Sequence, residues 1–222
     1  FSNSAITILL KNNIDIILLT YSGGFKGRIT SGMKKNIIIR HIQFKEQENQ
    51  EKMTRIARAI VMGKLENMRL FLRRHRNTDT GDIQHRLRLF ENQANNCDDL
   101  NTLRGFEGMG SRLYFQGFRK LLNRDFGFEK RIRRPPTDPI NVMLSFGYTL
   151  LALAIETAIQ IVGLDPFLGC FHVIDYGRPS LSLDLMEEFR SIIVDSMVLD
   201  MINHKMVGKD WFQTVSYTHL TL

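Results

Sequence analysis

A cluster of carboxylates in the last fifth of the chain is the clearest candidate for chemistry. Asp184, Glu187 and Glu188 are spaced at i, i+3 and i+4, which places Asp184 beside both glutamates on a helix. Like charges at this distance repel unless a cation lies among them or water solvates them fully. The spacing therefore leaves two interpretations open, a cation site or a solvated acidic helix start, and the helix dipole favours the second.

Two further residues could complete a metal site. His172 lies in a segment bounded by glycine and proline, and Glu107 lies among three glycines, where a backbone or a substrate can approach closely. One histidine with two or three carboxylates suits Mg²⁺ or Mn²⁺, because both ions prefer oxygen ligands and Mn²⁺ tolerates imidazole. The simpler alternatives are a packed or solvated histidine and a surface glutamate paired with Arg104 or Arg112.

The charge of the chain is unevenly divided. The 222 residues carry a net charge of +7, but residues 1–134 hold 26 basic and 13 acidic residues, whereas residues 135–222 hold 4 and 10. An excess of positive charge favours an anionic partner such as nucleic acid or a membrane surface. The two cysteines are far apart and suggest neither a disulfide framework nor a zinc site, which fits a reducing compartment.

The first 43 residues indicate part of a small β-rich domain. A short helix is expected over 3–10, followed by strands at 14–20, 25–29 and 37–39, with a Gly-Gly turn at 23–24. Three strands would be marginally stable alone.

Helical periodicity begins at residue 44 and continues to the end of the native sequence. We expect helices from 44 to 76, 82 to 95, 99 to 123 and 139 to 163, and a last long helix that begins at Ser180 as its cap. Asp138 and Gly163 have the residue types of an N-cap and a C-terminal stop. The fold class is therefore α+β, with a larger all-α domain over 44–214.

The most apolar window, 142–162, is about long enough to span a bilayer. Glu156 and Gln160 lie inside it, so we interpret it as a buried core helix and expect no membrane association. Residues 215–222 match the translation of a library-adapter sequence, and the chain does not begin with methionine. We expect the tail to be non-native and the chain to be a fragment of a longer protein.

Four ordered motifs give the chain a recognisable likeness. Together with Tyr114-Phe115, they resemble the successive signatures of the CRISPR-associated endonuclease family "Cas-one", and the resemblance extends from about residue 3 to 213. The motifs are Leu103 to Gly108, Arg134 to Tyr148, Gly163 to His172 and Gly177 to Arg190. The family's first strands and final C-terminal helices have no counterpart here.

The resemblance implies a metal-dependent DNA endonuclease and integrase of spacer acquisition, with Mg²⁺ or Mn²⁺ as cofactor. Glu107, His172 and Glu187 fall on the family's catalytic and metal-binding positions, and Asp184 falls on a supporting one. The implied architecture is an N-terminal β domain that dimerises and a helical catalytic domain. The implied partners are double-stranded DNA, a second copy of the chain and the small "Cas-two" protein, in the prokaryotic cytoplasm.

The basic residues near these motifs are candidates for holding DNA. Many phosphate contacts should give binding that depends weakly on sequence and steeply on salt. Tyr114 could equally be a core residue. The DNA-binding candidates are Arg112, Tyr114, Arg119, Lys120, Arg131, Arg133 and Arg134.

Two other functions stay open from the residues alone. The chain could be a non-catalytic basic nucleic-acid-binding module, with the acidic cluster only a solvated helix start, or a scaffold whose helices dock a partner protein. Dependence on a divalent metal separates the enzyme from the binding module.

Overall fold

The N-terminal part of the protein contains a helix and a two-stranded antiparallel sheet. Helix α1 spans Asn3–Lys11, and strands β1 (Ile16–Leu19) and β2 (Phe25–Ile29) pair with Ile16 opposite Ile29. The computed structural model describes residues 2–20, 25–32, 36–76 and 78–212, so the expected glycine turn at 23–24 and the suspected tail at 215–222 lie outside the described residues. The helix and two of the expected strands are confirmed.

The expectation of a third strand at 37–39 is wrong. These residues open helix α2 (Ile37–Gln47), whose first turn is capped by the Asn36 side chain accepting a hydrogen bond from the Ile39 amide. The run of isoleucines favours a strand by local preference, but Asn36 supplies a helix cap. Within the described ranges, the sheet contains β1 and β2 and offers this run no partner strand. Helix α2 also runs across the expected domain boundary at residue 43.

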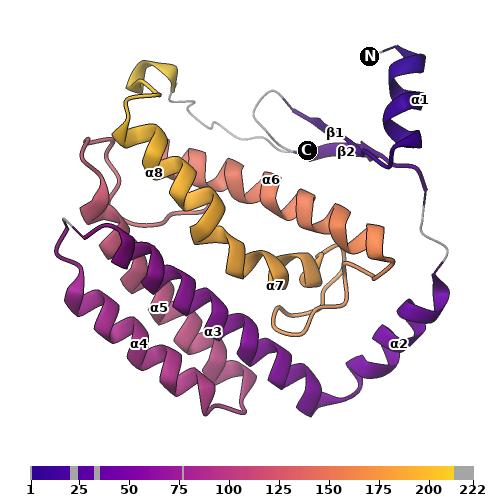
Figure 1. Ribbon diagram of the computed structural model, residues 1–222, viewed down its shortest axis with the longest axis horizontal. Helices are drawn as coiled ribbons and strands as arrows, with labels where there is room; N and C mark the ends of the chain where they lie inside the picture. Colours follow the sequence, from indigo (N-terminus) through magenta and orange to yellow (C-terminus); the bar gives the residue numbers. More distant parts are fainter. Residues whose placement is uncertain (1, 21–24, 33–35, 77, 213–222) are drawn as a thin grey trace.

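The rest of the chain forms two packed groups of helices (Figure 1). The first is α3 (Gln50–Arg74), α4 (Gly81–Asn95) and α5 (Leu100–Leu121). The second is α6 (Pro139–Val162), α7 (Ser180–Phe189), the π-helical segment Arg190–Asp195 and α8 (Ser196–Asn203), followed by a short 3₁₀ turn at Lys209–Trp211. The α+β class, mostly helical after a small sheet, is confirmed.

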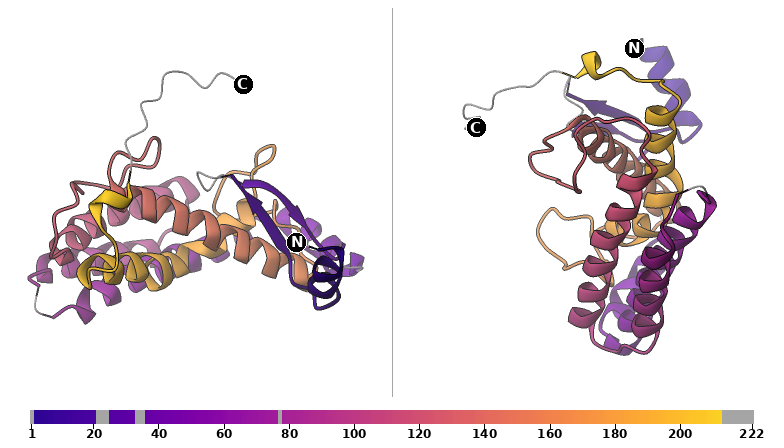
Figure 2. Two further views of the ribbon diagram at one scale, coloured as in Figure 1. Left: turned by 90° about the horizontal axis from the view of Figure 1, so that it is seen from above. Right: turned by 90° about the vertical axis from the view of Figure 1, so that its left-hand side faces the viewer.

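The hydrophobic core lies between the two groups. Helix α3 contacts α4 and α5 on one side and α7 with the π-helical segment on the other. Figure 2 shows the N-terminal hairpin lying across the far end of α6, away from the core. Arg28 of β2 fixes the hairpin there by bonding Gln160 at 2.9 Å and pairing with Glu156 at 3.3 Å.

Of the helix ends expected from the sequence, those at Asp99, Asp138 and Gly163 are confirmed and the cap at Ser180 is not. Asp99 and Asp138 accept hydrogen bonds from the first turns of α5 and α6, and Gly163 ends α6 with a left-handed φ of 91°. Ser180, however, is the first residue of α7 and not its cap. Its hydroxyl instead donates to the carbonyl oxygen of Val173 at 2.9 Å, which ties the preceding loop to the helix.

Helix α6 is apolar on two faces. Its inner face, with Leu144, Gly147 and Tyr148, packs against α7 and the π-helical segment, as expected of a core helix. Its outer face exposes Phe146 and Leu150, among other apolar residues. Within the described residues it is the one helix whose length and composition would allow it to cross a membrane, and a third of its most apolar window is buried.

The loop between α6 and α7 is held by α2. The Gln43 side chain accepts a hydrogen bond from the Asp165 amide at 2.8 Å and donates to the carbonyl oxygens of Asp165 and Leu168. Gln47 donates to the carbonyl oxygen of Gly169 at 3.0 Å. Two glutamines of one helix thus fix the backbone that leads to His172.

Candidate active site

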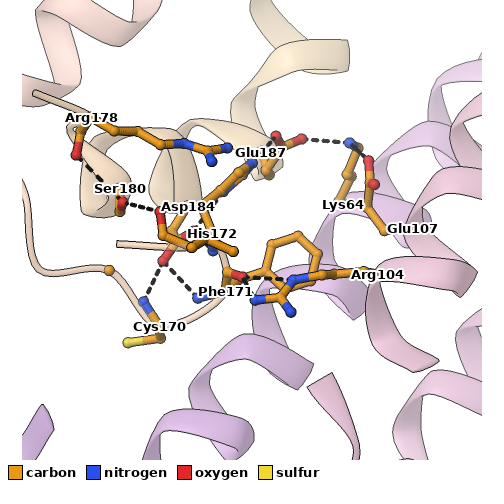
Figure 3. Close-up of polar contacts among 12 residues, drawn as sticks. Lys64, Arg104, Glu107, Cys170, Phe171, His172, Arg178, Ser180, Asp184 and Glu187 are labelled. Atoms are coloured by element: carbon orange, nitrogen blue, oxygen red, sulfur yellow. Dashed lines mark hydrogen bonds and ion pairs between the residues drawn. The ribbon is translucent and has the colours of Figure 1, made fainter. Parts of the chain in front are cut away.

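His172 is positioned by a single buried carboxylate. Asp184, in the first half of α7 and fully buried, accepts hydrogen bonds from the amides of Cys170, Phe171 and His172 at 2.5 to 2.9 Å (Figure 3). The same carboxylate lies 2.7 Å from Nδ1 of His172. Because a carboxylate oxygen accepts hydrogen bonds, Nδ1 is the donor in this contact, and Nε2 is left to face another group.

The loop that carries His172 is also fixed from helix α5. The Arg104 guanidinium donates twice to the carbonyl oxygen of Phe171, at 3.2 and 2.8 Å. The free face of the imidazole, at Nε2, lies 3.8 Å from Oε1 of Glu187. The histidine therefore presents Nε2 toward the second carboxylate of α7.

Glu187 is a buried, ionised carboxylate. Only 2% of its side chain is exposed, and it pairs with Lys64 at 2.5 Å and with Arg190 at 2.9 Å. Burial alone would raise its pKa, but the ammonium of Lys64 and the guanidinium of Arg190 outweigh burial and hold the pKa at about 2. Arg190 in turn lies over the Tyr148 ring, 4.6 Å from its centre.

Lys64 joins the two candidate carboxylates. Its ammonium pairs with Glu187 from α7 and with Glu107 from α5, and only 3% of the side chain is exposed. Glu107 also accepts a hydrogen bond from the Ser111 hydroxyl at 2.9 Å. The alternative, a surface pairing of Glu107 with Arg104 or Arg112, is not what the structure has, since Glu107 pairs with the buried Lys64. Figure 3 shows the ammonium between the two carboxylates.

Sequence reasoning missed Lys64 and Arg190. A signal for Lys64 was available, because it falls between Val61 and Met68 on the buried stripe of α3, where an unpaired lysine would be very costly. Arg190 lies three residues after Glu187, the spacing of a helical ion pair.

The acidic cluster is not a solvated helix start. Asp184 and Glu187 are buried, whereas Glu188 points away toward α3, where a Cβ on Gly63 would lie 2.9 Å from its Cδ. Across the described ranges, no three His, Cys, Asp or Glu side chains are grouped as a ready metal site. The Lys64 ammonium occupies the space between Glu107 and Glu187, the two carboxylates that a metal site would use.

A cleft of about 900 Å³ opens beside these residues. Lys64 and Glu107 form part of its wall, together with four of the seven DNA-binding candidates and with Lys130 and Arg190, which were not among them. The candidates that line the cleft are Arg112, Arg119, Arg131 and Arg133. The structure thus gathers basic residues of α5 and of the segment before α6 around Glu107, and a second carboxylate on the wall, Glu129, pairs with Arg119 at 2.7 Å.

Three DNA-binding candidates lie elsewhere. Tyr114 is wrong as a DNA contact, because its side chain is fully buried and its hydroxyl donates to Asp195 at 2.8 Å. Lys120 donates to the carbonyl oxygen of Asp79 at 3.0 Å, and Arg134 lines a neighbouring cleft. Arg131, although at the cleft, is anchored to the Asn141 and Ser145 side chains.

Comparison with known proteins places this arrangement in a family. The family model "CRISPR associated protein Cas1" matches residues 1–221. A CRISPR-associated endonuclease Cas1 from Thermus thermophilus is 40% identical over 202 residues, which cover 91% of this chain and 60% of that protein. The chain therefore spans about 60% of the length of this relative.

Two solved structures have the same fold. A chain in a Cas6-RT-Cas1–Cas2 complex is 29% identical with a TM-score of 0.78, covering 94% of this chain and 23% of the other. A casposase bound to integration product is 26% identical with a TM-score of 0.79, covering 97% of this chain and 61% of the other. With the family model matching almost every residue, and with the likeness extending through both helical groups, the chain belongs to the Cas1 family of CRISPR-associated proteins.

Proposed function

We propose that this protein is a metal-dependent DNA endonuclease and integrase of CRISPR adaptation, which joins the 3′-hydroxyl ends of spacer DNA to the repeat by transesterification. One observation carries the proposal. Carboxylates from two different helices close around a buried cationic group at the wall of a basic cleft. Membership of the Cas1 family, whose relatives are named endonucleases, supports the same reaction class.

Glu107, His172 and Glu187 would hold Mg²⁺ or Mn²⁺. The donor set fits, because two carboxylates already bracket a positive charge and Nε2 of His172 is directed at Glu187. Oε2 of Glu187 is buried and lies 2.5 Å from the Lys64 ammonium, so a metal ion bound there would have to displace that ammonium. A bound divalent ion would offset charge on the reacting phosphate and favour the nucleophilic form of the attacking hydroxyl.

The remaining residues bind and orient. Arg112, Arg119 and Arg133 offer positive charge along the cleft for a phosphate backbone. Asp184 holds His172 in one tautomer and one orientation, which removes a degree of freedom from the site. Arg190 keeps Glu187 ionised and in place.

The proposed partners are double-stranded DNA, a second copy of the chain and a Cas2 protein, in the prokaryotic cytoplasm. The solved relative in a Cas1–Cas2 complex and the casposase bound to integration product support assembly with Cas2 and action on DNA. The surplus of positive charge in residues 1–134 supports a polyanionic partner.

A non-catalytic nucleic-acid-binding module is the second candidate. It is favoured by the charge balance of the site, since Lys64 and Arg190 already neutralise Glu107 and Glu187 without a metal. Such a module would bind DNA equally well in the presence of a chelator.

The deciding experiment is strand transfer into a supercoiled plasmid that carries a repeat, with Mn²⁺ or with chelator. The wild-type protein should form joined product only with the metal. His172→Ala should lower strand transfer by at least about 100-fold, as expected for a lost ligand rather than an outer-shell group, while duplex binding is retained. His204→Ala, at the exposed end of α8, is the matched control and should stay active. Full activity of His172→Ala, or joined product in chelator, would contradict the proposal.

A further inference from the structure

The position of Lys64 raises a problem of charge for the proposed metal site. Four groups meet there, and the ammonium of Lys64 and the guanidinium of Arg190 balance the carboxylates of Glu107 and Glu187. A divalent ion bound to both carboxylates would come within a few ångströms of the ammonium and leave the cluster with two surplus positive charges. Like charges in a buried site are strongly unfavourable, so the ion and the ammonium exclude one another.

The basic cleft offers Lys64 a place to move. Its side chain forms part of the cleft wall, so a change of rotamer could carry the ammonium from the carboxylates into the cleft. There it would meet Arg112, Arg131 and Arg133, which repel it, while the carboxylate of Glu129 on the same wall is already paired with Arg119. A phosphate group of bound DNA in the cleft would remove that repulsion and accept the ammonium as a partner.

We propose that Lys64 is an internal cation that competes with the divalent metal and is released by a DNA phosphate, so that metal and DNA bind cooperatively. The inference rests on the proposed function and adds a positioning residue to it. Because coupling between two ligands is reciprocal, DNA tightens metal binding by the same factor by which metal tightens DNA binding. The free protein then binds metal weakly, which keeps the nuclease idle until DNA lies in the cleft.

The test is a calorimetric titration of Mn²⁺ into the 222-residue chain, with and without a short DNA duplex. DNA should tighten Mn²⁺ binding to the wild-type protein by at least about 5-fold, the lower end of the usual range for coupled sites. Lys64→Met, which keeps an unbranched side chain one atom shorter and removes its charge, should bind Mn²⁺ at least about 5-fold more tightly without DNA and should lose most of the coupling.

Two further variants separate charge from shape. Lys64→Arg keeps the internal cation and should retain the weak Mn²⁺ affinity of the wild type. Lys52→Met removes an exposed lysine of the same helix, paired with Glu46, and should change nothing. Unfolding curves establish that each variant is folded, and the wild-type titrations with and without duplex test the coupling even if Lys64→Met does not fold.

The outcomes distinguish the inference from the function on which it rests. If wild-type protein joins DNA with Mn²⁺ but a folded Lys64→Met binds Mn²⁺ no more tightly than wild type, competition by Lys64 is wrong and the enzyme proposal stands. The same holds if duplex leaves the wild-type Mn²⁺ affinity unchanged. If neither protein binds Mn²⁺, with or without duplex, and no product forms, the metal-dependent function itself is overturned.

Discussion

Asp184 organises the site without facing the cleft. One carboxylate accepts three amide hydrogen bonds and fixes the imidazole of His172. Gly169 is required beside it, because a Cβ there would lie 2.6 Å from Oδ2 of Asp184 and 2.6 Å from the Ser180 backbone. The supporting role expected for Asp184 therefore takes a definite form, that of a hub for the histidine loop.

The individual residues show where sequence reasoning stops. Glu107, His172 and Glu187 were nominated because their types suit a hard cation, and the structure brings them to one region. Lys64 was missed because which charge neutralises a buried carboxylate depends on how α3 packs against α7, a long-range fact that spacing does not encode, whereas the local i, i+3 spacing of Arg190 was overlooked. Tyr114 was misjudged since its hydroxyl serves a buried partner, Asp195.

Asp195 gives a prediction at the residue scale. Fully buried between the hydroxyls of Tyr114 and Tyr148, it has a pKa raised to about 6, chiefly by burial, which the tyrosine hydrogen bonds offset only in part. Because the folded state holds this proton more tightly than the unfolded chain, its stabilising effect is complete below about pH 4 and disappears as pH rises through about 6. The difference in free energy of unfolding between the wild type and Asp195→Asn should therefore shift against the wild type by roughly 1 to 3 kcal/mol from pH 4 to pH 7.

Urea unfolding at several pH values measures this difference. Asp200→Asn removes an exposed carboxylate from the neighbouring helix and serves as the control. A difference between wild type and Asp195→Asn that does not change with pH would contradict the assignment.

At the scale of elements, the π-helical segment Arg190–Asp195 shapes the site. It follows α7 directly and begins at Arg190, which pairs with Glu187 at ordinary helical spacing, and its wider turn leads to Asp195, which faces the core tyrosines. Helical periodicity predicts a continuous helix through these residues. The apolar pattern does not reveal the extra residue in this turn, because the apolar Ile192 and Ile193 are exposed and fit an α-helix or a π-helix equally well.

The local rules predicted most other elements. Caps and apolar spacing placed the starts of α5 and α6, and both are confirmed. The three glycines around Glu107 in α5 suggested a close approach of a backbone or a ligand. Gly110 is confirmed as a close contact, since a Cβ there would lie 2.3 Å from Leu65 Cδ2, while Gly108 lines the cleft and Gly105 has open space around it.

Packing of α6 on the π-helical segment gives a prediction at this scale. A Cβ on Gly147 would lie 2.5 Å from Cγ1 of Val194, so Gly147→Ala should destabilise the protein by about 1 to 3 kcal/mol through overpacking. Adding Val194→Ala should recover part of that loss, making the double variant more stable than the sum of the single effects predicts. Denaturant unfolding of all four proteins measures the coupling.

Gly105→Ala is the control for this cycle, because nothing lies near its Cβ position in α5. It should be neutral or stabilising by up to about 1 kcal/mol. Strict additivity of the Gly147 and Val194 effects would show that the two helices do not meet at this point.

At the scale of the whole molecule, the net charge understates how the two halves depend on each other. The acidic surplus of residues 135–222 is partly buried, and Glu187 is neutralised by Lys64 from the basic half. Composition predicted the unequal charge of the two halves. It did not predict the ion pairs between them, because composition says nothing about which charges become buried.

The basic cleft gives the prediction at this scale. Arg112→Glu and Arg133→Glu should each weaken duplex binding several-fold at physiological salt and lower the slope of log affinity against log salt by about 1. Lys120→Glu is the matched control, since Lys120 lies outside the cleft and bonds the Asp79 backbone. Fluorescence anisotropy at several salt concentrations measures the binding. If all three variants bound duplex alike, the cleft would not be the DNA-binding path.

The hydrogen bonds from α2 to the histidine loop carry a consequence for biosynthesis. Gln43 and its partner Asp165 are 122 residues apart, so the helix leaves the ribosome long before the backbone it must hold exists. The histidine loop, its carboxylate hub and Glu187 can assemble only after residue 187 has been synthesised, when the basic residues of 1–134 are already present. Until then, the basic residues of α5 and of the segment before α6 exist without the carboxylates of α7.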